Sequence, residues 1–243
     1  MLDYCFNRLA KFTTLSAEEK SAFRDAIDNE VSYARGENIL SAGKEPTTIH
    51  VIYHGWVSRY KLLDNGREHI MAYLIPGDMC DIHVTLLKKM DHSIRAETST
   101  TVGTISEKSI NHLLGHYPNL ARALFWSMMV DESITREWVI NLGGRSGEVR
   151  IAHFFCELFL RSQAAGLTRE SSFHLPINQI KLSETMGLTP VHTNRVLQSL
   201  RRQGLIVTRN STVEIPDWER LKAFADFSDD YLHMNLLNES REP

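Results

Sequence analysis

Long hydrophobic runs are missing from this sequence. Its 243 residues are 42% hydrophobic, enough for packed cores, yet it contains no stretch of about 18 apolar residues that could span a membrane. The first residues, MLDYCFNRLAKF, also lack the apolar segment of a secretory signal peptide. We therefore expect a cytoplasmic protein that has no membrane partner.

Cysteine is scarce as well. Cys5, Cys80 and Cys156 lie far apart in the chain, which excludes a paired disulfide framework and a four-cysteine metal or iron–sulfur cluster within one chain.

A strong net charge is the third absence, because the chain carries only −3. The charge is nevertheless uneven. Residues 177–213 hold five basic side chains against Glu184 alone, giving +4, whereas residues 214–243 hold eight acids against three bases, giving −5. A local basic surface on an acidic chain favours contact with DNA at one site without general adhesion.

The basic segment contains two short helical patterns, at about 178–186 and 190–203, separated by Gly187-Leu188-Thr189. Thr189 suits the N-cap of the second helix, because its hydroxyl can accept a free amide of the first turn, and Pro190 suits the first helical position. Gly204 can take the left-handed conformation that ends a helix.

At 3.6 residues per turn, the second helix has two different faces. Thr193, Val196, Leu197 and Leu200 form an apolar face directed at a core. The opposite face is polar and basic and could reach base edges in a major groove. It carries Val191, Asn194, Arg195, Gln198 and Arg202.

A small hairpin follows this helix. Leu205–Val207 and Val213–Ile215 read as two strands around the polar turn at 208–211, which makes the segment a winged helix-turn-helix. The alternative is a helical hairpin that caps a core without binding DNA.

The earlier part of the chain alternates with period two from Val31 to Ser106. Its tight-turn signals include Asp64-Asn65-Gly66 and Pro76-Gly77-Asp78, and this predicts an antiparallel barrel or jelly roll. A short packing helix with a capping box formed by Ser16 and Glu19 precedes it.

A long helix is predicted at 119–142, with an apolar seam that suggests a partner helix, most simply from a second subunit. Packing against its own barrel is the other interpretation. The seam consists of Leu120, Leu124, Met128, Ile134, Trp138 and Leu142. Glycines between 143 and 147 then break the helix, and an apolar helix at 148–165 should form a second core.

These patterns predict an α+β fold with four parts. They are a sensory antiparallel jelly-roll barrel (1–118), a dimerisation helix with its hinge (119–145), a winged helix-turn-helix (146–216) and an acidic helical tail (217–243).

That order resembles the Crp/Fnr family of bacterial transcription regulators. The resemblance is carried by HGWVSRYKLLDNGREHIMAYLIPGDM, IRAETSTTVGTIS and GLTPVHTNRVLQSLRRQGLI and covers nearly the whole chain. It implies a homodimer that binds a twofold-related site in double-stranded DNA, with reader helices about 34 Å apart. RNA polymerase is a further implied partner.

By position, the resemblance places Thr189 and His192 near phosphates, and Pro190, Val191, Asn194 and Arg195 toward bases. Arg195 could donate two hydrogen bonds to guanine. Val191 stands where well-known members carry a glutamate, so the preferred site should differ from theirs. Gln198, Arg202 and Arg209 complete the expected DNA-binding surface.

The family's cyclic-nucleotide site uses a glutamate for the ribose and an arginine-serine pair for the phosphate. Here Asp78 stands at the glutamate position and Met90-Asp91 at the arginine-serine step, so the phosphate clamp is missing. We expect an unidentified small-molecule effector, or lost sensing, rather than cyclic AMP. The expected pocket residues are Gly77, Asp78, Cys80, His83 and Arg95.

No cofactor and no metal site are predicted, although Cys80 with His83 could in principle ligate haem or a metal. The pair His112 and His116 has no third ligand. Two alternatives stay open beside the regulator: a metal-dependent, cupin-like barrel enzyme with a helical appendage, and a signalling scaffold that does not bind DNA. The enzyme is not favoured, because His50, His54, His69 and His83 do not reproduce cupin spacing.

Overall fold

The computed structural model describes residues 2–80, 82 and 88–234, and the chain divides into two compact units. The first unit runs to Glu132 and includes His233, and the second is Ser133–Leu232. The division falls inside helix α4 (Pro118–Gly144), so each unit contains one part of this helix. Among the described residues, no helix is long and apolar enough to cross a membrane.

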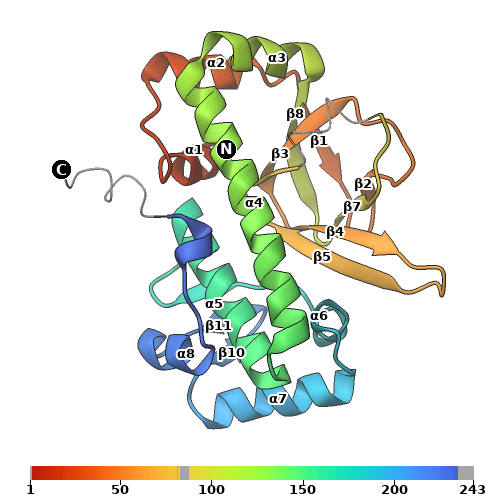
Figure 1. Ribbon diagram of the computed structural model, residues 1–243, viewed down its shortest axis with the longest axis vertical. Helices are drawn as coiled ribbons and strands as arrows, with labels where there is room; N and C mark the ends of the chain where they lie inside the picture. The colour runs from red at the N-terminus through yellow and green to blue at the C-terminus, as the bar shows by residue number, and fades with distance from the viewer. Residues whose placement is uncertain (1, 81, 83–87, 235–243) are drawn as a thin grey trace. The chain divides into compact units, whose positions relative to one another are not determined.

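Two four-stranded antiparallel sheets form the β part of the first unit (Figure 1), which confirms the antiparallel, barrel-like domain predicted from the alternation. Their orders are β1-β8-β3-β6 and β2-β7-β4-β5. The strands are β1 (Asn29–Tyr33), β2 (Asn38–Leu40), β3 (Thr48–His54), β4 (Val57–Leu62), β5 (Glu68–Leu74), β6 (Met79–Cys80), β7 (Ser93–Ala96) and β8 (Thr100–Ser106).

Strand β3 shows how the alternating sequence separates two cores. Ile52 points to one side of the strand, into a cluster that also contains Val57 and Ile94 of the other sheet. Ile49 and Val51 point to the opposite side, into a cluster with the helices. One strand therefore contributes to both layers, as its period of two requires.

The helices of the first unit are α1 (Asp3–Leu9), α2 (Ala17–Asp25) and α3 (Glu107–His116), joined by the first part of α4. The capping box of α2 is confirmed: Glu19 N–H donates to Ser16 Oγ at 3.1 Å, and Ser16 N–H donates to Glu19 Oε2 at 2.8 Å. Helix α1 was not predicted, because it is short and has no side-chain N-cap. Burial of Cys5, Phe6 and Leu9 in the helical core stabilises it instead.

The second unit is built on α5 (Gly147–Ala165), which is capped by Ser146 and ends at the left-handed Gly166. Helices α6 (Gln179–Met186) and α7 (Pro190–Arg202) pack with it, together with a sheet of order β10-β11-β9. The strands are β9 (Ser172–His174), β10 (Val207–Arg209) and β11 (Thr212–Glu214). The winged helix-turn-helix is thus confirmed, with β9 as an unpredicted third strand.

The predicted acidic helical tail (217–243) is only partly helical in its described residues. Helix α8 spans only Trp218–Phe224. Asp226 then adopts a left-handed φ of 48°, which an α-helix cannot contain, and η2 (Asp230–Leu232) is a single 3₁₀ turn. Phe227 and Leu232 are buried, so this segment packs as part of the second unit. Residues 235–243 of the predicted tail lie outside the described residues.

The residues of the predicted α4 seam pack largely within the chain. Leu120 and Leu124 are buried in the helical core of the first unit, and Trp138 is buried beside Phe154 of the second. Ile134 is also buried, and Met128 and Leu142 are partly buried. The helix also continues through Gly143 and Gly144, so the break consists of Arg145 and Ser146 only. Intramolecular packing explains the apolar periodicity that suggested a partner.

Candidate DNA-binding interface

The reader helix α7 is fixed at its start by the chemistry predicted for it. Gly187 ends α6 with a left-handed φ of 62°. Two residues later the Thr189 hydroxyl accepts the backbone N–H of His192 at 3.2 Å, and Pro190 opens α7. The turn between α6 and α7 is thereby closed within three residues, which holds α7 at a defined angle.

Burial on α7 follows the predicted helical wheel. Thr193, Val196, Leu197 and Leu200 are buried, whereas Val191 is 63% exposed. The nine residues predicted to bind DNA are all exposed, eight of them at or on α7 and one on the wing. They are Thr189, Pro190, Val191, His192, Asn194, Arg195, Gln198, Arg202 and Arg209. An exposed polar stripe over a buried apolar one is the surface that a major-groove reader requires.

The wing is tied to α7 by a contact that the sequence does not reveal. Arg201 Nε donates to Thr208 Oγ1 of β10 at 2.8 Å. Left-handed Asn210 and Ser211 turn the chain from β10 into β11, which leaves Arg209 exposed beside the turn. A cavity of about 230 Å³ between the wing, the start of α6 and the end of α7 is lined by Asn178, Arg201 and Arg209. The cavity is thus partly apolar, with cationic and amide donors along part of its lining.

A buried polar network is centred on α5, the helix against which α7 packs. Glu157 of α5 is fully buried and accepts hydrogen bonds from Trp138 at 3.0 Å, Arg161 at 3.1 Å and Tyr231 at 3.2 Å. Burial raises the pKa of Glu157, and the Arg161 charge opposes that rise. The three donors join α4, α5 and η2, so the carboxylate fixes the scaffold on which α7 rests.

In the first unit, Asp78 occupies the turn between β5 and β6 and is only 2% exposed. Its carboxylate accepts the Ile75 N–H at 2.9 Å and forms an ion pair with Arg8 of α1. Arg8 also pairs with Asp131 of α4 at 3.3 Å. Asp78 therefore serves the turn and an internal charge network, which gives no support to a role as an effector ligand.

The other predicted pocket residues are dispersed. Gly77 has a left-handed φ of 95°, and a Cβ there would lie 2.8 Å from the backbone of Tyr4. Cys80 is buried in the core between the sheets, and His83 lies outside the described residues. No group of three or more possible metal ligands occurs in the described part of the chain, and His116 Nδ1 lies 2.9 Å from the backbone oxygen of His112.

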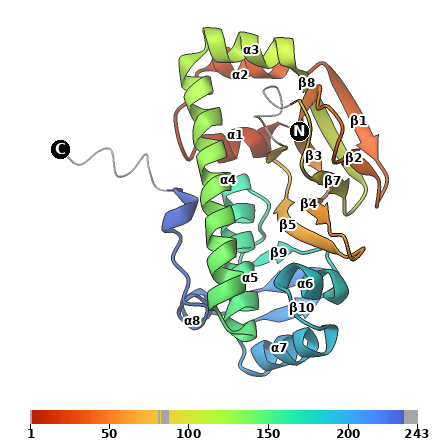
Figure 2. The same cartoon turned by 45° about the vertical axis from the view of Figure 1, so that its right-hand side comes forward.

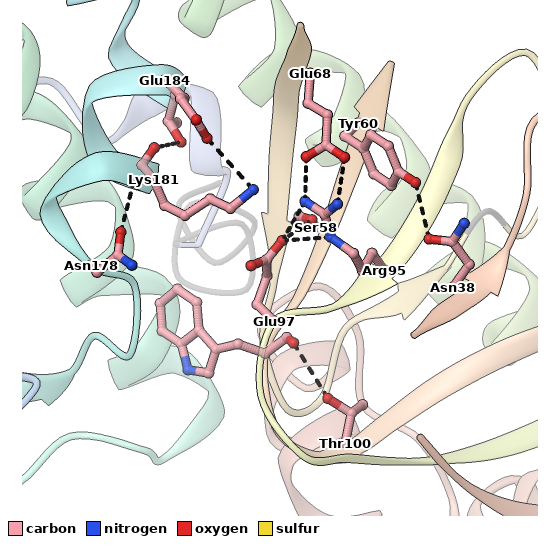
Figure 3. A network of polar contacts seen from close by, with 12 residues as sticks. Asn38, Ser58, Tyr60, Glu68, Arg95, Glu97, Thr100, Asn178, Lys181 and Glu184 are labelled. Carbon is pink, nitrogen blue, oxygen red and sulfur yellow. Dashed lines mark hydrogen bonds and ion pairs between the residues drawn. The ribbon is translucent and has the colours of Figure 1, made fainter. Parts of the chain in front are cut away.

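Arg95 lies on the face of its sheet opposite the buried Ile94, so it does not point into the core between the sheets. Figure 3 shows its guanidinium between two carboxylates, Glu68 at 2.6 and 2.8 Å and Glu97 at 3.2 and 3.3 Å. The Tyr60 ring lies 4.4 Å away. The hydrogen bonds to Glu68 are the main reason that the pKa of Arg95 is raised. These contacts already use the donors that would have held an anionic effector.

Comparison with known proteins matches both units to described domains. The profile of the cyclic nucleotide-binding domain matches residues 30–117, and that of the Crp-like helix-turn-helix domain matches residues 149–224. The nitrogen fixation regulation protein FixK of Bradyrhizobium diazoefficiens is 25% identical over 224 residues, 92% of each chain. The regulatory protein HlyX of Actinobacillus pleuropneumoniae is 23% identical over 86% of each chain.

A solved structure shares the fold. FixK2 from Bradyrhizobium japonicum superposes with a TM-score of 0.73 at 23% identity, covering 82% of this chain and 98% of that one.

Proposed function

Since the chain belongs to the Crp/Fnr family of bacterial transcription regulators, we propose that it acts as a homodimer that reads a twofold-related DNA site. The family consists of regulators, so the cupin-like enzyme is set aside. The observation that carries the proposal is the exposed stripe of α7 above its buried face, with the basic wing beside it. In the proposed dimer each subunit contributes one such helix, and the two helices together would contact two half-sites.

The dimer surface that we propose differs from the seam predicted from the sequence. On α4, Phe125 is 60% exposed and Val139 is 68% exposed, at positions that are two heptads apart on one helix face. Exposed large apolar side chains at this spacing are typical of helices that pair in water. The partner is therefore proposed to be α4 of a second copy.

The sensory unit is proposed to respond to a signal other than cyclic AMP, or to none. Support comes from the missing arginine-serine step at Met90-Asp91 and from the carboxylates that engage Arg95. A cyclic nucleotide needs an unpaired cation for its phosphate, and Arg95 could supply one only by leaving two ion pairs. A haem or metal bound through Cys80 and His83 has no support from the buried position of Cys80.

RNA polymerase is the proposed protein partner, and the cytoplasm is the proposed place of action, because a regulator works where its DNA and polymerase are. The alternative, a signalling scaffold that does not bind DNA, predicts no salt-dependent binding of a DNA duplex. A regulator that neutralises several phosphates loses affinity steeply as salt increases, because it releases counterions.

DNA selection on the purified protein tests the proposal, followed by titration of the selected duplex at several salt concentrations. We expect enrichment of one inverted-repeat motif and a linear fall of log affinity with log salt. Selection that enriches no motif would favour the scaffold. Repeating the selection with cyclic AMP present, and separately with a metabolite extract, tests the effector. Cyclic AMP is expected to leave affinity unchanged; a change with the extract would indicate another effector, and no change would indicate lost sensing.

A further inference from the structure

The first turn of α5 contains a contact point between the break after α4 and the DNA reader. Arg150 donates three hydrogen bonds to backbone carbonyls: Nε to Asn141 at 3.1 Å, Nη2 to Arg145 at 3.0 Å and Nη1 to Met186 at 2.6 Å. In return, Asn141 Nδ2 donates to the Arg150 carbonyl at 3.2 Å. All these residues belong to the second unit, where Figures 1 and 2 show the end of α4 and the start of α5 beside α7.

The three acceptors are of one chemical kind. Asn141 and Arg145 belong to the end of α4 and the break that follows it, and Met186 is the last residue of α6. Carbonyls at helix C-termini lack intrahelical partners and carry the negative end of the helix dipole. Arg150 therefore satisfies the ends of two helices with one charge, and its planar fork of five N–H donors suits acceptors in several directions. A lysine has the charge but no such fork.

The Met186 carbonyl is next to the part of the chain that sets the reader. Only Gly187, Leu188 and Thr189 separate α6 from α7, so a shift at Met186 displaces the N-cap of α7 almost directly. Gly147, three residues before Arg150, lies close to the start of α7. A Cβ on Gly147 would lie 2.6 Å from His192 Nε2 and 3.5 Å from Leu188 Cδ1.

We propose that Arg150 is a positioning residue for DNA reading, which couples the end of α4 to the α6–α7 turn and so fixes the orientation of α7. Gly147 supports the same coupling by leaving room for His192. Arg150 contacts no base in this account, because it acts through Met186 and the turn. The inference rests on the proposed function and adds to it a route by which the dimerisation helix controls the reader.

The test uses three variants of the full chain and the selected duplex. Arg150→Lys keeps the charge and removes the fork, and Gly147→Ala displaces the His192 ring without touching Arg150. Arg220→Lys is the matched control, because Arg220 donates to one carbonyl at the end of α7, that of Gln203, at 3.0 Å. Each is measured for affinity to the selected and to a scrambled duplex, for thermal unfolding, and for amide hydrogen exchange at residues 187–189.

We expect Arg150→Lys to weaken binding of the selected duplex roughly tenfold, about the loss of one base contact. Binding of the scrambled duplex and its salt dependence should stay as in the native protein, while exchange in the turn becomes faster. Gly147→Ala displaces His192, which is expected near a phosphate, so it should weaken binding of both duplexes but that of the selected duplex more, without a lower unfolding temperature. Arg220→Lys should change neither affinity.

The coupling is overturned if Arg150→Lys binds the selected duplex as the native protein does. It is equally overturned if affinity for both duplexes falls together with the unfolding temperature, since that outcome marks a purely structural role. Should Arg150→Lys fail to fold, Gly147→Ala decides: unchanged selectivity rejects the coupling. If the native protein itself enriches no motif, the proposed function fails first and this inference fails with it.

Discussion

Arg195 is the side chain with the most specific expected role on the reader, because a guanidinium on an exposed α7 can donate two parallel hydrogen bonds to guanine O6 and N7. We predict that Arg195→Ala weakens binding of the selected site by about 1–3 kcal/mol and relaxes preference at one base pair. Competition titration with single-base variants of the site measures both effects. Equal weakening on every sequence would make Arg195 a phosphate contact.

Val191 gives a second residue-scale prediction. Its exposed methyl groups can touch a thymine methyl, whereas a glutamate at this position can accept from cytosine N4. Val191→Glu should therefore move the preferred base from thymine to cytosine at one position of each half-site, with discrimination of about 1–3 kcal/mol. Repeating the selection with the variant checks this, and an unchanged motif would remove Val191 from the base-facing group.

Residue positions on α7 could be predicted from the sequence because helix periodicity, the Thr189 cap and the Gly204 stop are local signals. The pairing of Arg8 with Asp78 could not, since the partners are far apart in the chain and meet only after α1 packs on the barrel. Arg95 was predicted as a pocket residue, but its pairing with Glu68 and Glu97 depends on strand register, which the sequence does not show. Long-range pairs of this kind follow from topology, which local patterns do not contain.

At the scale of elements, the buried His153 of α5 is expected to make the stability of the second unit sensitive to acid. Burial, aided by the Arg145 charge, lowers the pKa of His153 from 6.5 to about 3. Glu137 Oε1 lies 3.2 Å from His153 Nε2 but is already paired with Arg145, so its attraction does not restore the proton. Below pH 6.5 the His153 imidazole binds a proton in the unfolded chain but stays neutral in the folded chain. Stability is thus complete above that pH and falls as pH decreases toward 3.

We therefore predict that the free energy of unfolding of the second unit decreases between about pH 7.5 and about pH 5.5, by at most about 1.4 kcal/mol per pH unit from this group. Urea unfolding at the two pH values measures it. His153→Phe should remove this part of the pH dependence while keeping the aromatic contacts with Phe227 and Tyr231. An equal pH dependence in the variant would place the sensitivity elsewhere.

Helix α4 provides the other element-scale prediction. Val139→Glu puts a charge in the proposed dimer surface, where its desolvation opposes association. We expect the variant to be a folded monomer in light scattering, with lower affinity for the paired site. Leu114→Glu, a comparable change on exposed α3, is the control and should remain dimeric. Two dimeric variants would reject the α4 surface.

The same helix shows what an apolar seam can and cannot predict. Leu120, Leu124 and Trp138 recur at helical spacing because α4 packs against the cores of its own units, first one and then the other. Periodicity reveals that a face is buried but not what covers it. The sequence alone could not show that Phe125 and Val139 remain exposed after the helix packs in the fold.

At the scale of the whole molecule, we propose that α4 pairs with α4 of a second copy and that the end of this helix sets the orientation of α7 in each subunit. If this proposal holds, the geometry of the dimer adds to the base contacts of α7 as a source of selectivity. Two readers fixed on one dimer must meet half-sites that face the same side of the duplex, about one helical turn apart.

The measurement that tests this claim most directly is binding of the selected duplex after insertion of about five base pairs, half a helical turn, between its half-sites. Paired readers on a rigid dimer predict that this insertion lowers affinity to the level of a single half-site. An insertion of about ten base pairs returns the half-sites to the same side of the duplex but increases their distance, so it should lower affinity less. Unchanged affinity after the half-turn insertion would contradict the account, because it would mean that each chain reads DNA alone.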